Sequence, residues 1–303
     1  MPRLMTVAAA QIDPKLFDRD GNLIKIERFA RDAAERGAQL IVFPEVAVTG
    51  YCFKSLEEAL PYAEAVPGPA VVALTRMAQA LGVHLVVGFL EEDAGAVYNS
   101  VVLVGPEGVI GVHRKAHLPY LGIDRFVQHG QGPLRVHETP AGSIGMHVCY
   151  EATFPEVART MALQGAELLV LPTNWPEGRQ KMPEYVVHAR ALENRVHLIA
   201  CDRVGEERGF RFIGRSKIIN ATGDSLAVAS ADKEEIIVAQ VDLDLPHNKR
   251  IVFQPNAFEV DLFGDRRPEL YGPIGRHARS DDLRNNRGES LERGERRTAR
   301  DVG

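Results

Sequence analysis

Short apolar runs rich in β-branched residues recur along the chain, and turn-forming or polar stretches separate them. Runs of about four to eight such residues predict buried β-strands. Few of them alternate cleanly with polar positions, which indicates sheets that are covered on at least one face. The predicted strands are Met5–Ala10, Leu40–Phe43, His84–Phe89, Ser100–Val104, Gly108–Val112, Ser143–Val148, Leu168–Leu171, His197–Cys201, Ile213–Ile219 and Glu235–Val241.

Stretches between these runs place apolar residues three or four positions apart, which is the spacing of an amphipathic helix. The predicted helices are Leu23–Arg36, Ala70–Leu81, Phe154–Gln164 and Glu184–Arg195. Gly82 and Gly165 stand where helix C-cap glycines are expected. A predicted hairpin, Asn99–Val104 with Val109–His113, argues against an all-parallel sheet. The pattern therefore predicts a layered, mixed α/β domain.

This domain is expected to span residues 1–272, because no linker or change of composition interrupts it. From about residue 275 the amino-acid composition changes: Arg276 to Gly303 is rich in Arg, Glu, Asp, Asn and Gly. Such a segment cannot bury enough apolar surface to fold alone. Residues 273–303 are therefore predicted to be a charged tail, either mobile or lying on a partner subunit.

Composition excludes several functions. The 303 residues are 45% hydrophobic and 25% charged, with a net charge of -5, which is ordinary for a packed enzyme and argues against nucleic-acid binding. No apolar run approaches the roughly 18 residues that a membrane span needs, and Leu4–Ala10 is too short for a signal peptide. We expect a soluble, cytoplasmic protein. Its cysteines, Cys52, Cys149 and Cys201, lack pair spacing and predict free thiols.

Cys149 is the first candidate for chemistry. It follows a predicted strand and shortly precedes a predicted helix, where aligned amide dipoles favour the thiolate. Taken alone, a single cysteine is more often a buried packing residue.

The sequence around Cys149, Gly145-Met146-His147-Val148-Cys149-Tyr150-Glu151-Ala152-Thr153-Phe154-Pro155-Glu156, resembles the nucleophile segment of the nitrilase superfamily, the carbon–nitrogen hydrolases. Upstream, Ile41-Val42-Phe43-Pro44-Glu45 resembles the family's glutamate motif, and His113-Arg114-Lys115-Ala116-His117-Leu118-Pro119 its lysine motif. The resemblance runs from Ala8 to about Tyr271. It implies a four-layer α-β-β-α sandwich with mixed sheets, and subunits that pair into a homodimer or a higher oligomer.

Glu45, Lys115 and Cys149 suit this chemistry as residue types. A carboxylate takes the proton of the thiol and later activates water. The ammonium of Lys115 and the backbone N–H of Tyr150 are expected to stabilise the oxyanion that forms when the thiolate attacks an amide.

One position departs from the family pattern. Members usually carry a second active-site glutamate between the lysine and cysteine motifs. Asp124, one methylene shorter, stands closest to the expected place here, and Glu138 lies too near the next predicted strand. Asp124 is retained as a possible second carboxylate.

Four residues that flank the motifs are expected to line the substrate pocket: Tyr51, Tyr120, Asn174 and Trp175. Arg125 and Arg179 are candidates for recognising a substrate carboxylate. His113 and His117 are four apart, but no third ligand is obvious, so no metal is expected, and the reaction needs no cofactor.

The leading hypothesis is a cysteine hydrolase of small-molecule amides or N-carbamoyl compounds that releases ammonia or an amine. A nitrilase acting on a nitrile is the first alternative, and Tyr150 in place of the tryptophan of true nitrilases favours amides over nitriles. A catalytically silent scaffold subunit is the second alternative, and the presence of all three catalytic residue types argues against it.

Overall fold

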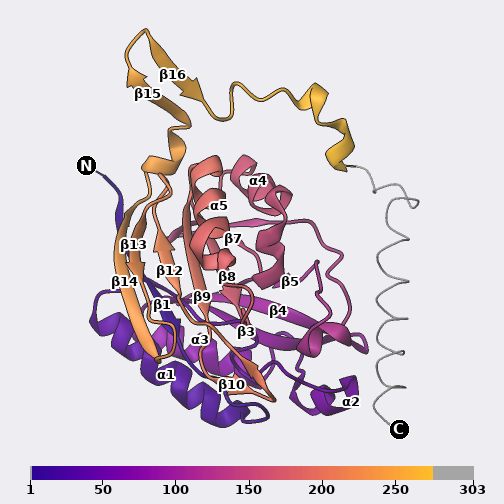
Figure 1. Ribbon diagram of the computed structural model, residues 1–303. Coiled ribbons are helices and arrows are strands. Elements are labelled where there is room, and N and C mark those ends of the chain that lie inside the picture. The colour runs from indigo at the N-terminus through magenta and orange to yellow at the C-terminus, as the bar shows by residue number, and fades with distance from the viewer. Residues whose placement is uncertain (1, 276–303) are drawn as a thin grey trace. The chain divides into compact units, whose positions relative to one another are not determined.

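The computed structural model describes residues 2–275. These form a compact unit that extends to Leu262 and a short segment from Phe263 onward. The compact unit contains two six-stranded mixed sheets. Helices cover the outer face of each sheet, which gives the four-layer α-β-β-α sandwich that the family resemblance implies (Figure 1).

The first sheet has the strand order β14-β1-β2-β3-β4-β5. Its strands are β1 (Leu4–Gln11), β2 (Leu40–Val42), β3 (His84–Asp93), β4 (Ala96–Gly105), β5 (Gly108–Arg114) and β14 (Glu235–Asp242). Strands β1, β2 and β3 are parallel, whereas β4 and β5 form the predicted antiparallel hairpin. Strand β14 pairs antiparallel with β1, so the first and last long strands within residues 2–275 lie side by side.

The second sheet has the order β13-β12-β9-β8-β7-β6. Its strands are β6 (Val136–Thr139), β7 (Gly142–Met146), β8 (Leu168–Thr173), β9 (His197–Asp202), β12 (Lys217–Ile219) and β13 (Ser225–Val228). Strands β7, β8 and β9 are parallel, and the pairs at either edge are antiparallel. Two small hairpins complete the strands: β10 (Glu206–Glu207) with β11 (Phe210–Arg211), and β15 (Arg250–Gln254) with β16 (Phe258–Asp261).

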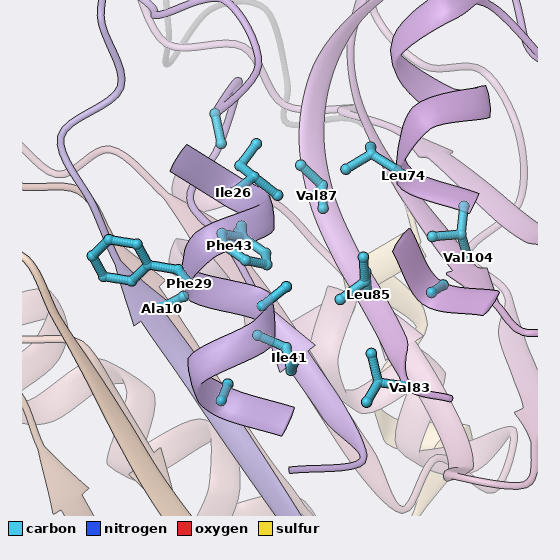
Figure 2. Packing of buried hydrophobic residues seen from close by; sticks show 14 of the residues in the cluster. Ala10, Ile26, Phe29, Ile41, Phe43, Leu74, Val83, Leu85, Val87 and Val104 are labelled. Atoms are coloured by element: carbon cyan, nitrogen blue, oxygen red, sulfur yellow. The ribbon is translucent and has the colours of Figure 1, made fainter. Parts of the chain in front are cut away.

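Helices α1 (Arg19–Glu35) and α3 (Pro69–Leu81) pack against the first sheet. Figure 2 shows Ile26 and Phe29 of α1 and Leu74 of α3 above the strand residues Ile41 and Leu85. This cluster buries apolar side chains on the outer face of the sheet, and burial of such a side chain stabilises the fold by about 1.5–3 kcal/mol.

The remaining helices are shorter. They are α2 (Leu56–Ala59), α4 (Pro155–Leu163), α5 (Val187–Asn194), a π-helical turn (Met182–Val186), and 3₁₀ turns η1 (Leu60–Tyr62), η2 (Gly122–Arg125), η3 (Cys149–Thr153), η5 (Leu245–His247), η6 (Pro268–Leu270) and η7 (Gly272–Gly275). Helices α4 and α5 contact each other and cover the second sheet.

Three predicted boundaries were wrong for identifiable reasons. The strand predicted over Ser143–Val148 ends at Met146, because the next residues lead into η3. The strand predicted over Ile213–Ile219 is reduced to β12, because Ile213 and Ser216 donate their N–H groups to Trp175 and Gln11 instead. The helix predicted to start at Glu184 is preceded by the π-helical turn.

Cys52, Cys149 and Cys201 are all free, as predicted, and the structure buries all three. Within residues 2–275 no helix is both long and apolar enough to cross a bilayer. The domain boundary at residue 272 stays a prediction, and the predicted tail lies, from residue 276 on, outside the described residues.

Candidate active site

The candidate residues gather where parallel strands of both sheets end. Glu45 follows β2, Cys149 follows β7, and Asn174 follows β8, each just beyond the carboxyl end of its strand. Lys115 directly follows β5, and Asp124 lies in η2. In α/β proteins, ligands bind outside the carboxyl ends of parallel strands, so this is the place where the fold favours a site.

Three of these charged side chains are in direct contact. Lys115 Nζ lies 2.6 Å from Glu45 Oε1 and 2.5 Å from Asp124 Oδ2, so a single ammonium bridges two carboxylates. Glu45 and Lys115 are fully buried, and Asp124 is 4% exposed. Buried charges are tolerated only when they are paired and hydrogen-bonded. The Lys115 ammonium therefore compensates charge on both buried carboxylates.

Asn99, in the middle of β4, completes this unit. Its Nδ2 donates to Glu45 Oε1 at 2.7 Å and to Asp124 Oδ1 at 2.8 Å. Its backbone carbonyl accepts the N–H of Lys115 at 2.9 Å. Asn99 thus contacts all three charged residues and fixes the separation of the two carboxylates.

The backbone at Glu45 is held in an uncommon conformation. Val46 has φ of 47°, a left-handed value that β-branched residues rarely adopt. Gly88 of β3 packs against this turn so closely that a Cβ there would lie 2.2 Å from the Val46 nitrogen. A glycine is therefore required at position 88 for Glu45 to take its place.

Cys149 is also held in left-handed backbone, with φ of 47°, where it opens the turn η3. Its side chain is almost fully buried. Burial, followed by the nearby Glu45 carboxylate, raises the pKa of the thiol above its ordinary value, and the Lys115 ammonium opposes this shift. The resting side chain is therefore a neutral thiol, which needs a base before it can attack.

Electrostatics make Glu45 a suitable base. Burial raises the pKa of Glu45, and Lys115 acts in the opposite direction. Its Oε2 atom is buried and has no hydrogen-bond partner within the described part of the chain, whereas Oε1 is occupied by Lys115 and Asn99. Burial alone lowers the pKa of Lys115, but Asp124 and Glu45 outweigh it and raise the pKa, so this lysine stays charged.

Glu151 ties the lysine segment to the cysteine turn. Its carboxylate accepts the N–H of Ala116 at 2.8 Å and that of Val148 at 2.7 Å. His113 Nε2 lies 2.8 Å from Oε2, and His117 Nδ1 lies 3.6 Å from Oε1. Although burial opposes it, these partners hold the pKa of Glu151 well below its usual range.

The two histidines thus face one carboxylate. Over residues 2–275, no group of three or more His, Cys, Asp or Glu side chains has an arrangement that could hold a metal ion.

The residues predicted to bind substrate occupy different environments. Tyr51 is buried, and its hydroxyl donates to Asp124 at 2.7 Å. Asn174 donates through Nδ2 to the Glu45 carbonyl at 2.9 Å and leaves its buried Oδ1 unpaired. Trp175 is 1% exposed, and its indole N–H also has no partner in the described residues. Tyr120, in contrast, is 86% exposed.

Tyr150 is half-buried and follows Cys149 in η3, with its ring 5.2 Å from that of Phe154. The roles assigned to Glu45, Lys115, Cys149, Asp124 and Tyr150 from the sequence remain predictions, although the first four lie at or beside one buried cluster.

Sequence reasoning assigned no role to Asn99 or Glu151. Asn99 carried a signal, because it interrupts the apolar strand β4 with a polar side chain. A polar residue inside an otherwise apolar strand is expected to have a specific partner. Glu151 carried a weaker signal, since a carboxylate two residues after Cys149 could equally have been exposed.

Residues 6–248 match the sequence profile of the carbon–nitrogen hydrolase family. A protein of Pyrococcus abyssi named nitrilase is 41% identical over 271 residues, which cover 88% of this chain and 99% of that protein. An N-carbamoylputrescine amidase of Solanum lycopersicum is 34% identical over 290 residues, or 89% of this chain and 94% of that one.

Solved structures agree with the fold. A carbon–nitrogen hydrolase from Helicobacter pylori G27 has a TM-score of 0.78 at 25% identity and covers 91% of this chain and 99% of its own. A mutant amidase from Nesterenkonia sp. AN1 has a TM-score of 0.73 at 26% identity, with 88% of this chain and 95% of that one covered. In that structure the acetamide moiety of fluoroacetamide is covalently added at the active site cysteine.

Proposed function

This chain belongs to the carbon–nitrogen hydrolase family, within the nitrilase superfamily, and we propose that it hydrolyses small-molecule amides or N-carbamoyl compounds with Cys149 as the nucleophile. The observation that carries the proposal is the buried contact of Lys115 with Glu45 and Asp124, beside a buried thiol whose pKa responds to Glu45 and Lys115. In buried, low-dielectric surroundings, electrostatic interactions with a reacting carbonyl are stronger than in open water.

In the first half of the reaction, the unpaired Oε2 of Glu45 takes the thiol proton as Cys149 Sγ attacks the carbonyl carbon. The developing oxyanion is stabilised by the Lys115 ammonium and the Tyr150 N–H. When the tetrahedral intermediate collapses, the C–N bond breaks, and the proton held by Glu45 passes to the leaving nitrogen. Ammonia or an amine leaves, and a thioester remains on Cys149.

In the second half, Glu45 accepts a proton from water as the water oxygen attacks the thioester carbonyl. The C–S bond then breaks, the thiolate recovers the proton from Glu45, and the carboxylic acid is released. Asp124 and Asn99 act as positioning residues in this scheme, because both contact the Lys115–Glu45 pair and neither needs to touch the substrate.

Three similar proteins bear on the substrate class. The tomato relative is named for an N-carbamoyl substrate and the Nesterenkonia protein is an amidase, which supports an amide or carbamoyl compound. The name of the Pyrococcus relative favours the second candidate, hydrolysis of a nitrile by the same residues through a thioimidate. Tyr150 after Cys149 keeps amides as the first choice.

We further propose that the protein works in the cytoplasm as a homodimer or higher oligomer without a cofactor. The scheme above moves protons, water and an acyl group only, and the residues of this chain supply every proton transfer in it.

The test is release of ammonia from a panel of amides, N-carbamoyl compounds and nitriles, measured beside the Cys149→Ala variant. Release from amides or N-carbamoyl compounds that vanishes in the variant is the expected result. Release from nitriles alone would replace the first candidate with the second. A folded wild type that is inert towards the whole panel, with Cys149 unreactive to a thiol reagent, would favour a silent scaffold subunit.

A further inference from the structure

The loop that carries Tyr51 is held by a buried carboxylate from a different part of the chain. Glu207 lies in β10, between β9 and β12 of the second sheet, whereas Tyr51 follows β2 of the first sheet. Glu207 Oε1 accepts the backbone N–H of Tyr51 at 2.8 Å and that of Cys52 at 2.5 Å. Because Glu207 is only 6% exposed, these charge-assisted bonds are stronger than the same bonds at the surface.

The other oxygen of this carboxylate contacts a buried arginine. Arg203 Nη1 lies 2.7 Å from Glu207 Oε2, and Arg203 Nη2 lies 2.8 Å from Asp13 Oδ1 and 2.9 Å from the Pro14 carbonyl. The guanidinium carbon also lies 4.3 Å from the ring centroid of Phe212. Buried ion pairs can often be replaced by apolar residues without loss of stability. Stability alone therefore does not account for these two buried charges.

The backbone before Tyr51 is shaped to reach the Glu207 carboxylate. Gly50 has φ of 81°, in the left-handed region that favours glycine. A Cβ at Gly50 would lie 2.9 Å from Glu207 Oε2 and 2.7 Å from the Leu16 Cα. A side chain at this position would push the loop away from the carboxylate, so the glycine allows two N–H groups to converge on one oxygen.

Tyr51 in turn holds the segment that carries Asp124 at two points. The Tyr51 carbonyl accepts the N–H of Ile123 at 2.9 Å, and the Tyr51 hydroxyl donates to Asp124 Oδ2 at 2.7 Å. Gly122 packs on the tyrosine ring so closely that a Cβ there would lie 2.6 Å from it. Asp124 Oδ2 is also the atom that contacts Lys115 Nζ. A displacement of Tyr51 therefore reaches the lysine ammonium through a single carboxylate.

We propose that Glu207 is a positioning residue that sets the place of the Lys115 ammonium. It acts through Tyr51 and Asp124, and Arg203 fixes its carboxylate. Within residues 2–275 the partners of this carboxylate are Arg203 and the backbone of the Tyr51 loop, so its effect on the chemistry is indirect. The inference rests on the proposed function, because it takes Lys115 as the group that stabilises the oxyanion.

The thiol of Cys149 reports where the ammonium lies. The titratable groups that face Lys115 are Asp124, Glu45 and Cys149. Burial and then the Glu45 carboxylate raise the pKa of the Cys149 thiol, and the Lys115 ammonium lowers it. If the ammonium moves away, this pKa rises further and the thiolate fraction at a given pH falls. The rate of alkylation follows that fraction, because the thiolate is the nucleophile.

The experiment measures the rate constant for alkylation of Cys149 by iodoacetamide at one fixed pH, resolved from Cys52 and Cys201 by peptide mass spectrometry. In Glu207→Gln the amide must turn its N–H₂ group toward Arg203 or toward the two backbone donors, which releases the loop. We expect the rate constant to fall about tenfold, as a rise of one unit in the thiol pKa provides. A merely structural role predicts the opposite sign, since loosened packing exposes the thiol. A rate constant equal to or above that of the wild type overturns the proposal.

Glu58→Gln is the matched control. The Glu58 carboxylate also pairs with an arginine of this hairpin, Arg208, and also accepts a backbone N–H, that of Lys54. Its partners do not include Tyr51, so Glu58→Gln should be alkylated at the wild-type rate. Equal slowing in Glu58→Gln and Glu207→Gln would assign the effect to the loop as a whole and would overturn the proposal.

Tyr51→Phe tests the path to the ammonium. It removes the hydroxyl that donates to Asp124 and is expected to slow the alkylation of Cys149. Combined with Glu207→Gln, it should slow alkylation by less than the product of the two single effects, because both changes act on one connected network. Effects that multiply would overturn the path through Tyr51.

Glu207→Asp decides the question if Glu207→Gln does not fold. It keeps the charge beside Arg203, but its carboxylate is one methylene too short to hold the arginine and both N–H groups. A smaller slowing in the same direction is expected, and a rate at or above that of the wild type overturns the proposal. Alkylation needs no turnover, so a wild type that is inert towards the amide panel counts against the proposed function alone. In an active enzyme, kcat of the folded Glu207 variant should fall with KM little changed, and a raised KM at unchanged kcat overturns the positioning role.

Discussion

The Glu151 carboxylate accepts the backbone N–H of Ala116 at 2.8 Å, so the turn that begins at Cys149 is fastened to the residue after Lys115. The same carboxylate accepts the N–H of Val148, on the other side of the cysteine. One buried side chain therefore sets the separation of the two segments that carry the proposed nucleophile and the proposed oxyanion-stabilising lysine.

Glu151→Gln tests this fastening. The neutral amide turns an N–H₂ group toward at least one donor, and it removes the negative charge that faces His113. We expect the free energy of unfolding to fall by about 3 kcal/mol, because a buried backbone N–H group is left facing another donor. Urea denaturation measures this loss. Glu138→Gln, which changes an exposed carboxylate on β6, should leave the urea midpoint in place. Equal midpoints for the two variants would contradict the assignment.

Removal of the Asn99 amide is expected to shift the pH dependence of catalysis. The hydrogen bond from Asn99 is one of the contacts that lower the pKa of Glu45 against the effect of burial. In Asn99→Ala the pKa of Glu45 rises further, so the acidic limb of the kcat/KM profile moves to higher pH. Ser100→Ala removes the neighbouring buried hydroxyl, which donates to Glu91 at 2.7 Å, and should leave the limb where it is. An unmoved limb in Asn99→Ala would remove Asn99 from the positioning role.

Asp124→Asn is expected to move the opposite limb. Burial lowers the pKa of Lys115, and Asp124 is the leading group that raises it. Without this carboxylate the pKa of Lys115 falls, so the basic limb of the kcat/KM profile moves to lower pH. We also expect kcat to fall about 10²-fold or more, the range seen when one oxyanion-stabilising donor is lost. Asp124→Glu, which keeps the charge, should retain more activity than Asp124→Asn; the reverse order would contradict the proposed role.

The buried imidazole of His147 is expected to make the free energy of unfolding depend on pH. Burial lowers the pKa of this fully buried imidazole to about 4, from 6.5. The unfolded chain takes up a proton below pH 6.5, whereas the folded protein resists it until about pH 4, so stability is lost as pH falls through this window. The loss from His147 is about 3 kcal/mol. The free energies of unfolding of the wild type and His147→Gln, measured from pH 7 to 4, should converge by this amount. A constant difference would show that His147 titrates normally.

Gly88→Ala tests the backbone that carries Glu45. A Cβ at this position would lie 2.2 Å from the Val46 nitrogen and 2.7 Å from the Glu45 Cα, so the turn must move. We expect a loss of about 2–3 kcal/mol of stability from overpacking, together with a decrease in kcat. Gly132→Ala is the matched control, because no atom lies within 4 Å of a Cβ built there. Wild-type kcat in Gly88→Ala would mean that the Glu45 position tolerates this shift.

The fold was largely predictable because its central strands are apolar and bounded by turn residues. Strand β3 and the hairpin β4–β5 could be located from residue pattern alone, as could helix α3 with its Gly82 cap. Strands β6 and β13 were missed, because each has only four residues and none of these residues is fully buried. Edge strands bury little, so their sequences carry little of the apolar signal on which such prediction depends.

The candidate site was predictable where motif and residue chemistry coincided, at Glu45, Lys115 and Cys149. Contacts that depend on the fold were not. The bridge from Asn99 to Glu45 and Asp124 joins residues far apart in the chain, and no local spacing encodes it. Arg125 and Arg208 likewise come from distant segments, and only the structure places both of them in the lining of one cavity.

The pairing of β14 with β1 has a consequence for biosynthesis. The first sheet contributes Glu45 and Lys115, and the second contributes Cys149, but the first sheet lacks one of its six strands until residues 235–242 have been made. A ribosome-bound chain that stops after Tyr150 has every proposed catalytic residue and still lacks the strand beside β1. Hydrolytic activity should therefore appear only after β14 has been made, and its onset during translation would report the completion of the first sheet.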